Sequence, residues 1–457
     1  MDAIDPSLTS PSSPPLEIAI IGCGIIGTVL ALGLLNNSPS PSAIRVKIYE
    51  QAASIREIGA GIAFTANARK CMFMIDSRLP ECVRAVATAN GDPDNPTNYM
   101  QFVDGYTHDP GNTEVGQELE GRTVHKLHAG ERGFEGCHRA QFLEQVMKLM
   151  PEGVVELRKR LVRLDEEGGE GGRVQMSFED GSVEIADAVI GCDGIKSLVR
   201  QHLLGAANPS SHPHYTHKIA YRGLVPMPQA IEKLGLYRAT NQHMYGGPSA
   251  HLLHFPVMQQ KLMNVVAFVN DHDGWPLQKP MSQPATRDET GIAFQDWGPT
   301  VRAIIDLLPD QMDKWAVFDH LDYPASEGYS KGRVCLAGDA AHASSPHHGA
   351  GAGIGIEDAL ALTTVLGLVQ RDLMKGGGVE KVSLLEKAFQ VFTKVRYERS
   401  MWLVKSSREA CEIYEWNHPE FGSDMAKAHK DIRRRSHKIW YFDIEGMLRE
   451  LEDEFRR

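Results

Sequence analysis

The amino-acid sequence predicts an α/β protein, in which a Rossmann-like nucleotide-binding domain carries an inserted antiparallel β-sheet domain and a helical C-terminus. Three observations predict this class. A strand, a glycine-rich turn, a helix and a second strand follow one another from residue 16. The stretch 211–330 is rich in short β-type patterns, and residues 381–457 have the periodicity of charged helices.

The 457 residues are enough for two or three domains or for one large composite fold. In the interrupted arrangement, the nucleotide-binding domain is formed by two separate parts of the chain. We expect, in chain order, a Pro- and Ser-rich tail (1–15), the first part of the nucleotide-binding domain (16–210), a β-rich substrate-binding domain (211–330), the second part of the nucleotide-binding domain (331–380) and the helical C-terminal region (381–457).

The first unit contains a GxGxxG dinucleotide fingerprint between its strand and its helix. Gly22 allows the tight turn, Gly24 lets the backbone approach a pyrophosphate, and Gly27 lets the helix pack close to the strand. The free amides at the start of the helix favour the phosphates. Glu50 ends the second strand, where a carboxylate accepts a hydrogen bond from a ribose hydroxyl. The alternative is a glycine-rich turn without a ligand.

Composition and charge argue against several kinds of partner and cellular location. The net charge is −11, which disfavours nucleic acid as a partner, because phosphates select Lys- and Arg-rich surfaces. The seven cysteines include no CxxC pair and are odd in number, which argues against a disulfide framework and fits a reducing, cytoplasmic compartment. The apolar stretches are too short and interrupted for an integral membrane segment, and the N-terminus lacks a secretory signal.

One group of histidines raises the question of a metal. His212, His214 and His217 are closely spaced, but no acid cluster and no HExxH pattern accompanies them. We therefore expect no metal site.

Two further motifs complete the argument. Gly191-Cys-Asp193-Gly194 and Gly338-Asp339-Ala-Ala-His342 follow the fingerprint in this order. With them, nearly the whole chain resembles the group A flavoprotein monooxygenases of the para-hydroxybenzoate and salicylate hydroxylase type. The resemblance implies a GR2-type FAD-binding domain, tightly bound FAD, NADPH or NADH as a transient reductant, and O₂ as co-substrate. The absence of a second GxGxxG agrees with a nicotinamide that only visits the site.

The resemblance also implies roles for residues along the FAD. Asp339 accepts hydrogen bonds from the ribityl hydroxyls, and Asp193 serves the FAD and the visiting nicotinamide nucleotide. For Asp193 the alternative is a cap for the helix that begins near Lys196, and the two roles are compatible. The remaining FAD contacts implied by the resemblance are Gly61, Arg139, Pro346, Gly351 and Ala352.

The resemblance implies hydroxylation of a phenolate by a flavin C4a-hydroperoxide, which requires a cation near the phenol oxygen. In "HKIAYRGLVP", alternation places Lys218, Ala220 and Arg222 on one face of a strand. The alternative for Arg222 is an ion pair with a surface acid. The stretches "HPHYTHKIAYRGL" and "GPSAHLLHFPV" resemble fungal dearomatising monooxygenases of tropolone, sorbicillinoid and azaphilone pathways, and this resemblance implies that Arg222 clamps the phenolate.

One position departs from that group. Some members have a Tyr that shares phenolate binding, where this chain has Phe255, which cannot donate a hydrogen bond. Either Arg222 acts alone, or Tyr106, Tyr245 or His254 assists it. His347, in the flavin loop, either contacts the substrate and relays a proton or only shapes the loop.

The sequence therefore predicts a monomeric or homodimeric FAD monooxygenase acting on a small phenol. The expected substrate is a resorcinol-type polyketide aldehyde or ketone, hydroxylated with loss of aromaticity. Two alternatives stay open, a hydroxylase of salicylate-like acids and a flavin oxidoreductase that transfers no oxygen. A flavin protein without turnover is a further alternative, although nothing in the sequence indicates lost chemistry.

Overall fold

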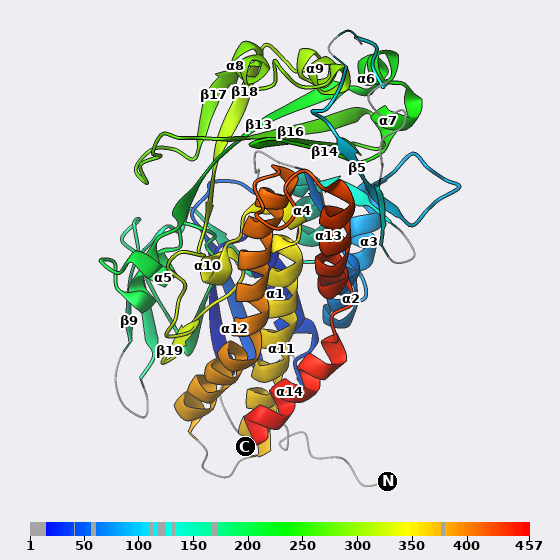
Figure 1. The fold of residues 1–457 in the computed structure, drawn as a ribbon. Helices are drawn as coiled ribbons and strands as arrows, with labels where there is room; N and C mark the ends of the chain where they lie inside the picture. Colours follow the sequence, from blue (N-terminus) through cyan, green and yellow to red (C-terminus); the bar gives the residue numbers. More distant parts are fainter. Residues whose placement is uncertain are drawn as a thin grey trace.

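The computed structural model describes residues 15–40, 42–55, 61–109, 111, 113–116, 125–129, 133–166, 172–375 and 380–457. The expected N-terminal tail lies outside these residues, apart from residue 15. The chain forms a Rossmann-like part joined to a large antiparallel sheet, with long helices between and beside them (Figure 1). The expected fold class is confirmed.

The nucleotide-binding part is built on a six-stranded, mainly parallel sheet. Strand β1 (Leu16–Ile21), helix α1 (Ile25–Asn36) and strand β2 (Ile44–Glu50) form the expected βαβ unit. The strand order is β19-β20-β12-β1-β2-β8, with bounds β8 Val155–Leu157, β12 Ala188–Gly191, β19 Ser330–Lys331 and β20 Val334–Leu336. Strand β20 pairs with β12 in parallel, so the chain returns to this sheet after the strands of the large sheet.

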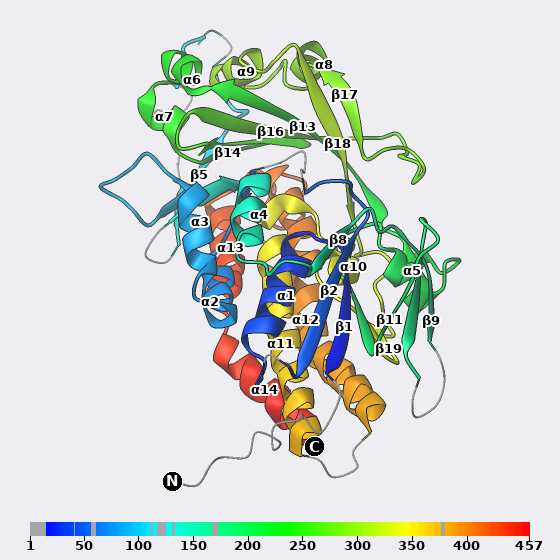
Figure 2. The same cartoon turned by 180° about the vertical axis from the view of Figure 1, so that it is seen from behind.

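The inserted domain is an eight-stranded sheet that lies across the top of the molecule (Figures 1 and 2). Its order is β17-β18-β13-β16-β15-β14-β5-β6, with bounds β5 Asn98–Asp104, β6 His125–His128, β13 His214–Pro226, β14 His243–Gly247, β15 Ala250–Val257, β16 Leu262–Asn270, β17 Ser282–Thr286 and β18 Gln311–Asp319. The expected hairpin of β15 and β16 is present. Strands β5 and β6 come from before residue 211, so the sequence-based boundary leaves out two strands of this sheet.

Smaller elements complete the two parts. Four helices, α6 to α9, lie over the outer face of the large sheet (Figure 2). Their bounds are α6 Met227–Leu234, α7 Leu236–Thr240, α8 Arg287–Ala293 and α9 Pro299–Asp306; the others are β3 Gly61–Ala63, α2 Ala66–Ile75, α3 Leu79–Val86, β4 Thr88–Ala89, β7 Glu135–His138, α4 Arg139–Met147, β9 Leu161–Glu166, β10 Val174–Phe178, β11 Val183–Ala186, α5 Leu198–Leu204, η3 Pro209–Ser211, α10 Asp339–His342 and η4 Pro346–His348.

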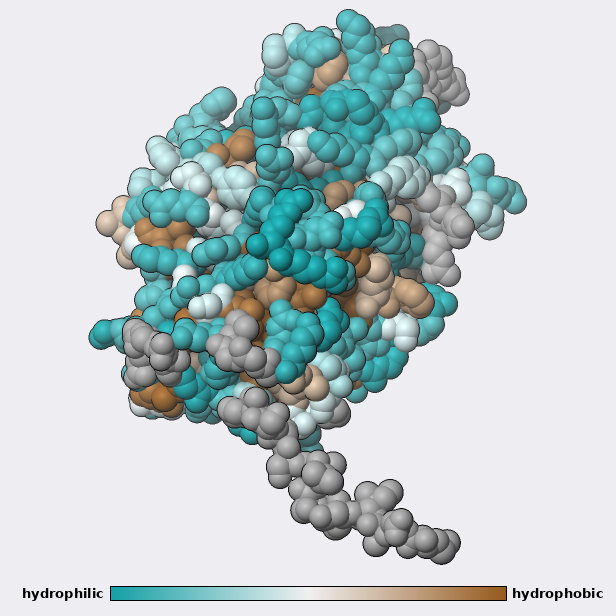
Figure 3. Space-filling model, turned by 90° about the horizontal axis from the view of Figure 1, so that it is seen from below, coloured by the Kyte–Doolittle hydropathy of each residue, from teal (hydrophilic) through white to brown (hydrophobic). Residues whose placement is uncertain are grey.

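The C-terminal region, residues 381–457, is helical, as expected. Helix α11 (Gly351–Lys375) runs beside α12 (Lys381–Tyr414), and α13 (Met425–Trp440) and α14 (Ile444–Arg456) pack around them (Figure 1). Helix α11 is long and apolar enough to cross a membrane, but 89% of its most apolar window is buried inside the fold. It is therefore the core helix of this part. The face of the molecule seen from below is mainly hydrophilic, with scattered apolar patches (Figure 3).

Candidate active site

A cavity of about 400 Å³ lies between the nucleotide-binding part and the inner face of the eight-stranded sheet. It continues from the glycine-rich turn after β1 to the strands β13, β16 and β15, and the loop before α11 closes one side. A single space therefore contains most of the residues that the sequence assigned to cofactor and substrate. The predicted residues that line the cavity are Gly24, Gly61, Arg139, Arg222, Phe255, Asp339, Pro346, His347, Gly351 and Ala352.

The glycine turn has the geometry that the fingerprint requires. Gly22 has a φ of +103°, and a Cβ there would lie 2.5 Å from the carbonyl oxygen of Cys192. A Cβ at Gly27 would lie 2.1 Å from the carbonyl oxygen of Gly22. Gly24 lines the cavity, and a Cβ there would lie 3.7 Å from Nη2 of Arg139. The backbone of this turn and the Arg139 side chain of α4 thus lie together at the cavity, an arrangement that suits a pyrophosphate.

The Glu50 carboxylate stabilises this turn by accepting two backbone hydrogen bonds. Its Oε2 accepts the backbone N–H of Cys23 at 2.8 Å, and its Oε1 accepts that of Ala52 at 2.8 Å. The carboxylate does not line the cavity itself. Each oxygen retains a second lone pair, so the expected contact with a ribose hydroxyl stays a prediction.

Asp339 is the first residue of α10 and also lines the cavity. It is exposed to the cavity and makes no side-chain hydrogen bond with any residue that the structure describes. An ionised carboxylate only accepts hydrogen bonds, so it requires donors from outside the protein. A ligand with several hydroxyl groups, such as the ribityl chain of FAD, supplies them, and the residues at this end of the cavity fit the cofactor.

Asp193 contacts the start of α5, and its expected role toward the FAD and the nicotinamide nucleotide stays a prediction. Its carboxylate accepts the hydroxyl hydrogen of Ser197 at 2.5 Å and the backbone N–H groups of Leu198 and Val199 at 2.8 and 3.2 Å. It therefore caps α5, which is the alternative considered from sequence. Its neighbours Cys192 and Gly194 line the cavity, whereas Asp193 does not.

Arg222 extends from β13 into the cavity. Its guanidinium carbon lies 5.1 Å from the centre of the Trp315 ring, and its Nε is buried without a hydrogen-bond partner. No carboxylate among the described residues forms an ion pair with it, so the alternative of a surface salt bridge does not apply. Burial lowers the pKa of Arg222, but a guanidinium stays charged at neutral pH. The site thus presents an unmatched positive charge to a ligand.

Phe255 of β15 lines the cavity from the same face of the sheet as Arg222. Its ring lies 5.3 Å from that of Phe134, edge on, and a Cβ at Gly61 would lie 2.7 Å from its Cε2. Gly61 therefore leaves the space that the Phe255 ring fills. This wall is apolar, as expected from Phe in place of Tyr.

The three residues considered as partners of Arg222 in phenolate binding do not line the cavity. Tyr106, Tyr245 and His254 are absent from the cavity wall. Tyr245 and His254 are buried on the other face of the sheet, where the Tyr245 hydroxyl lies 3.2 Å from Nε2 of His254. Alternation along β14 and β15 directs these side chains away from Arg222.

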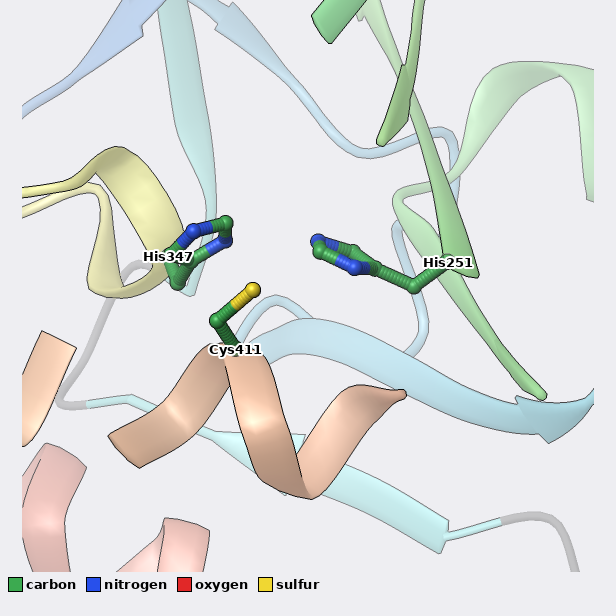
Figure 4. A group of neighbouring side chains, drawn as sticks. All are labelled: His251, His347 and Cys411. Atoms are coloured by element: carbon green, nitrogen blue, oxygen red, sulfur yellow. The ribbon is translucent and has the colours of Figure 1, made fainter. Parts of the chain in front are cut away.

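A histidine that sequence reasoning missed lies in the cavity instead. His251 of β15 and His347 of η4 face one another, and Cys411 of α12 lies beside both (Figure 4). A nitrogen of each imidazole and the Cys411 sulfur lie within 4.8 Å of one another. Burial lowers the pKa of both histidines, so both are neutral at neutral pH. Alternation in "AHLLHFPV" could have indicated His251, because it shares a face with Phe255.

Comparison with known proteins agrees with this site. Two family models match, an FAD binding domain over residues 152–377 and an FAD-NAD(P)-binding model over residues 19–196. The FAD-dependent monooxygenase pigN of Monascus ruber is 48% identical over 97% of this chain and 98% of its own length. The salicylate hydroxylase asL1 of Sarocladium schorii is 44% identical over 96% of this chain and 91% of its own length.

Solved structures give the same result. A salicylate hydroxylase substrate complex has a TM-score of 0.79 and 32% sequence identity, and the match covers 96% of this chain and 98% of the other. The similarities cover nearly the full length of the chain and agree with a cavity whose residues fit FAD. The chain belongs to the FAD-dependent monooxygenases of the salicylate hydroxylase type and uses FAD as its cofactor.

Proposed function

We propose that this protein hydroxylates a resorcinol-type phenolic aldehyde or ketone, at a ring carbon that already carries a substituent, so that the ring loses its aromaticity. One atom of O₂ enters the product, the other leaves as water, and NADPH or NADH donates two electrons. The bound FAD supplies the activated oxygen. The protein's own task is to hold the phenol, to favour its anion and to exclude water.

The observation that carries this proposal is the unmatched guanidinium of Arg222. A buried cation without a protein partner favours an anionic ligand, because Coulomb attraction is strong away from bulk water. A phenolate next to Arg222 has a lowered pKa and a more electron-rich ring, which is what an electrophilic oxygen donor attacks. Arg222 is thus the residue we assign to the phenolate.

Part of the cavity wall is apolar and suits the aromatic ring of the phenol. The cavity is lined by apolar side chains, Phe134, Leu253, Phe255, Val266 and Phe268, and by polar ones that include Gln242 and Asn264. The other arginine that lines the cavity, Arg139, lies at the glycine turn and is assigned to FAD. Substrate binding on this reading uses one cation and apolar contacts, which suits a single phenolate.

A salicylate-like acid is the second candidate, because two similar proteins carry the name salicylate hydroxylase. Such a substrate carries a carboxylate, which also fits one guanidinium. It then leaves no second cation for the phenol oxygen among the cavity residues that the structure describes. The seven free cysteines support the expectation of a reducing, cytoplasmic compartment for either reaction.

The test uses the purified holoenzyme with NADPH, O₂ and either an alkylated 2,4-dihydroxybenzaldehyde or salicylate. We expect rapid NADPH oxidation with the aldehyde and a product that is one oxygen heavier and lacks the aromatic near-ultraviolet band. Release of CO₂ and formation of a catechol from salicylate at a higher rate would favour the second candidate. NADPH oxidation that yields only hydrogen peroxide would reject both substrates.

A further inference from the structure

Two buried carboxamides, those of Gln242 and Asn264, line the cavity beside Phe255. Gln242 is 5% exposed and Asn264 is 7% exposed. Neither side chain makes a hydrogen bond with any residue that the structure describes, and Oε1 of Gln242 is buried without a partner. Buried polar side chains nearly always have a hydrogen-bond partner in folded proteins. These two carboxamides therefore require a partner that is not part of the described chain.

Asn264 lies on β16 and has only apolar neighbours on its face of the sheet. It is opposite Leu224 of β13 and Phe255 of β15. Along its own strand, the side chains on the same face are those of Leu262 and Val266. None of these four side chains can donate or accept a hydrogen bond. The Asn264 carboxamide therefore reaches hydrogen-bonding groups through the cavity that it lines.

Gln242 comes directly before β14 and has a similar setting. The register of β14 with β15 and β5 places Gln242 between Phe255 and Met100, both of which also line the cavity. Its backbone is held on both sides, because its N–H donates to Oδ1 of Asn90 at 2.9 Å and its carbonyl accepts the N–H of Gln101 at 3.1 Å. The start of this side chain is therefore fixed at the cavity wall.

The two carboxamides lie on the same face of the sheet as Arg222. Arg222 is opposite Val266, two residues after Asn264, so Arg222 and Asn264 are diagonal neighbours with Cα atoms about 7–8 Å apart. Gln242 lies two strands from Asn264, about 10 Å away, with Phe255 on the strand between them. An aromatic ring bound against this face thus meets one cation and two neutral amides.

The chemistry of the amides selects the groups they can bind. A carboxamide NH₂ donates to a carbonyl oxygen, and its oxygen accepts the hydrogen of a hydroxyl group. With a phenolate oxygen at Arg222, a carbonyl group ortho to it falls beside Asn264. A hydroxyl group farther around the ring falls beside Gln242, whose Oε1 lacks a donor. A carboxylate in place of the carbonyl would bring a second negative charge, which a neutral amide does not balance.

We infer that Asn264 binds the aldehyde or ketone oxygen of the substrate and that Gln242 binds its second ring hydroxyl. The inference rests on the proposed function and deepens it. The two carboxamides select an acylated resorcinol over a benzoic acid. A ring held through three oxygen groups has one orientation in the cavity, so they also determine which ring carbon faces the activated oxygen.

The experiment measures ligand affinity with the oxidised holoenzyme, from the change in flavin absorbance on binding. The proteins are wild type, Asn264→Leu and Gln242→Met, in which the side chain keeps its approximate size and loses its hydrogen bonds. Gln101→Met is the matched control, because Gln101 is a buried carboxamide of β5 that donates to the Tyr237 hydroxyl at 2.8 Å and does not line the cavity.

Three ligands are compared, an alkylated 2,4-dihydroxybenzaldehyde, the same compound without its 4-hydroxyl group, and the same compound without its aldehyde group. In the wild type, loss of the 4-hydroxyl group should raise the Kd about tenfold, because the Gln242 oxygen is then left without a donor. Gln242→Met should bind the parent aldehyde about tenfold more weakly and should not distinguish it from the compound without the 4-hydroxyl group. Gln101→Met should behave as the wild type does.

Asn264→Leu should lose the preference for the aldehyde group in the same way. Removal of the aldehyde also makes the phenol less acidic, so the assignment of Asn264 depends on the difference between wild type and variant, as in a double-mutant cycle. FAD content and the flavin spectrum without ligand are recorded for every protein.

Three results would overturn the inference. The first requires no variant, and is a wild type that binds the parent aldehyde and the compound without the 4-hydroxyl group with Kd values within about twofold. The second is a ligand preference that persists unchanged in both Gln242→Met and Asn264→Leu. The third is an altered flavin spectrum in both ligand-free variants, which would assign the carboxamides to FAD.

Failure of the proposed function gives a different result. A wild type that shows these ligand preferences but forms only hydrogen peroxide with NADPH and O₂ refutes hydroxylation and retains the assignment of Gln242 and Asn264 to the ligand.

Discussion

The guanidinium of Arg222 lies 5.1 Å from the centre of the Trp315 ring, and no carboxylate in the described part of the chain pairs with it. Stacking on an aromatic face orients the planar group without using its hydrogen-bond donors. This arrangement supports the proposed role of Arg222 in binding a phenolate.

Replacing Arg222 with Gln should remove phenolate stabilisation and leave the FAD site intact. We expect kcat/KM for the phenol to fall by about 10²–10³-fold, the range found when one charge-stabilising donor is removed. The measurement is the rate of substrate-dependent NADPH oxidation, with FAD content as the control. Arg222→Lys keeps the charge but loses the planar fork, so it should recover only part of the rate. Full activity in Arg222→Gln would show that the phenolate binds elsewhere.

Asp339 and Asp193 should respond differently to the same change. Asp339→Asn should weaken FAD binding by about tenfold or more, because hydrogen bonds to a charged group contribute about 1.5–3 kcal/mol. Asp193→Asn should mainly weaken the cap of α5 and lower stability by about 1 kcal/mol. Titration of the apoprotein with FAD and thermal unfolding separate the two effects. Equal losses of FAD affinity would place Asp193 in the cofactor site.

Gly61 and Phe255 should be coupled. Gly61→Ala places a Cβ 2.7 Å from the Phe255 ring, and overpacking of this kind costs about 1–3 kcal/mol. In a Phe255→Leu background the smaller side chain should remove much of that cost. A double-mutant cycle on the free energy of unfolding measures the coupling. Additive losses would mean that the two residues do not compete for this space.

Stability should fall in acid through Asp358. Its Oδ2 lies 2.5 Å from Nε2 of His342 and its Oδ1 accepts from Nε of Arg396 at 2.9 Å. Burial by itself would raise the pKa of Asp358, but His342 and Arg396 lower it overall. Because the folded pKa lies below the unfolded one, the stabilisation is present above the unfolded pKa and disappears as the pH falls through the folded pKa.

Asp358→Asn should therefore cost about 3–5 kcal/mol near neutral pH, since it leaves a buried guanidinium without this partner. The variant should also lose less stability than wild type on acidification. Thermal unfolding midpoints over a pH series give both quantities. Parallel curves for variant and wild type would assign the acid sensitivity to other groups.

Local patterns predicted much of this molecule. The spacing of Gly22, Gly24 and Gly27 predicts a tight turn with close backbone approaches, and the structure has this turn. Arg222 was placed on the correct face, because strand alternation depends only on neighbouring residues.

Other features depend on contacts between distant segments and could not be predicted in this way. Strands β5 and β6 join the large sheet from far upstream, and no local signal shows which sheet a short strand joins. The contact between His251 and Glu415 joins β15 to α12, across 164 residues of sequence. His254 was considered as an assistant of Arg222, although strand alternation places it on the opposite face of the sheet.

The most direct test of the central claim is the fate of labelled oxygen. Holoenzyme, NADPH and the alkylated 2,4-dihydroxybenzaldehyde are combined under ¹⁸O₂, and the product is analysed by mass spectrometry. The account predicts one labelled oxygen in a non-aromatic product from wild type, and almost none from Arg222→Gln. An unlabelled product, or peroxide as the sole oxygen-derived product of the wild type, would contradict it.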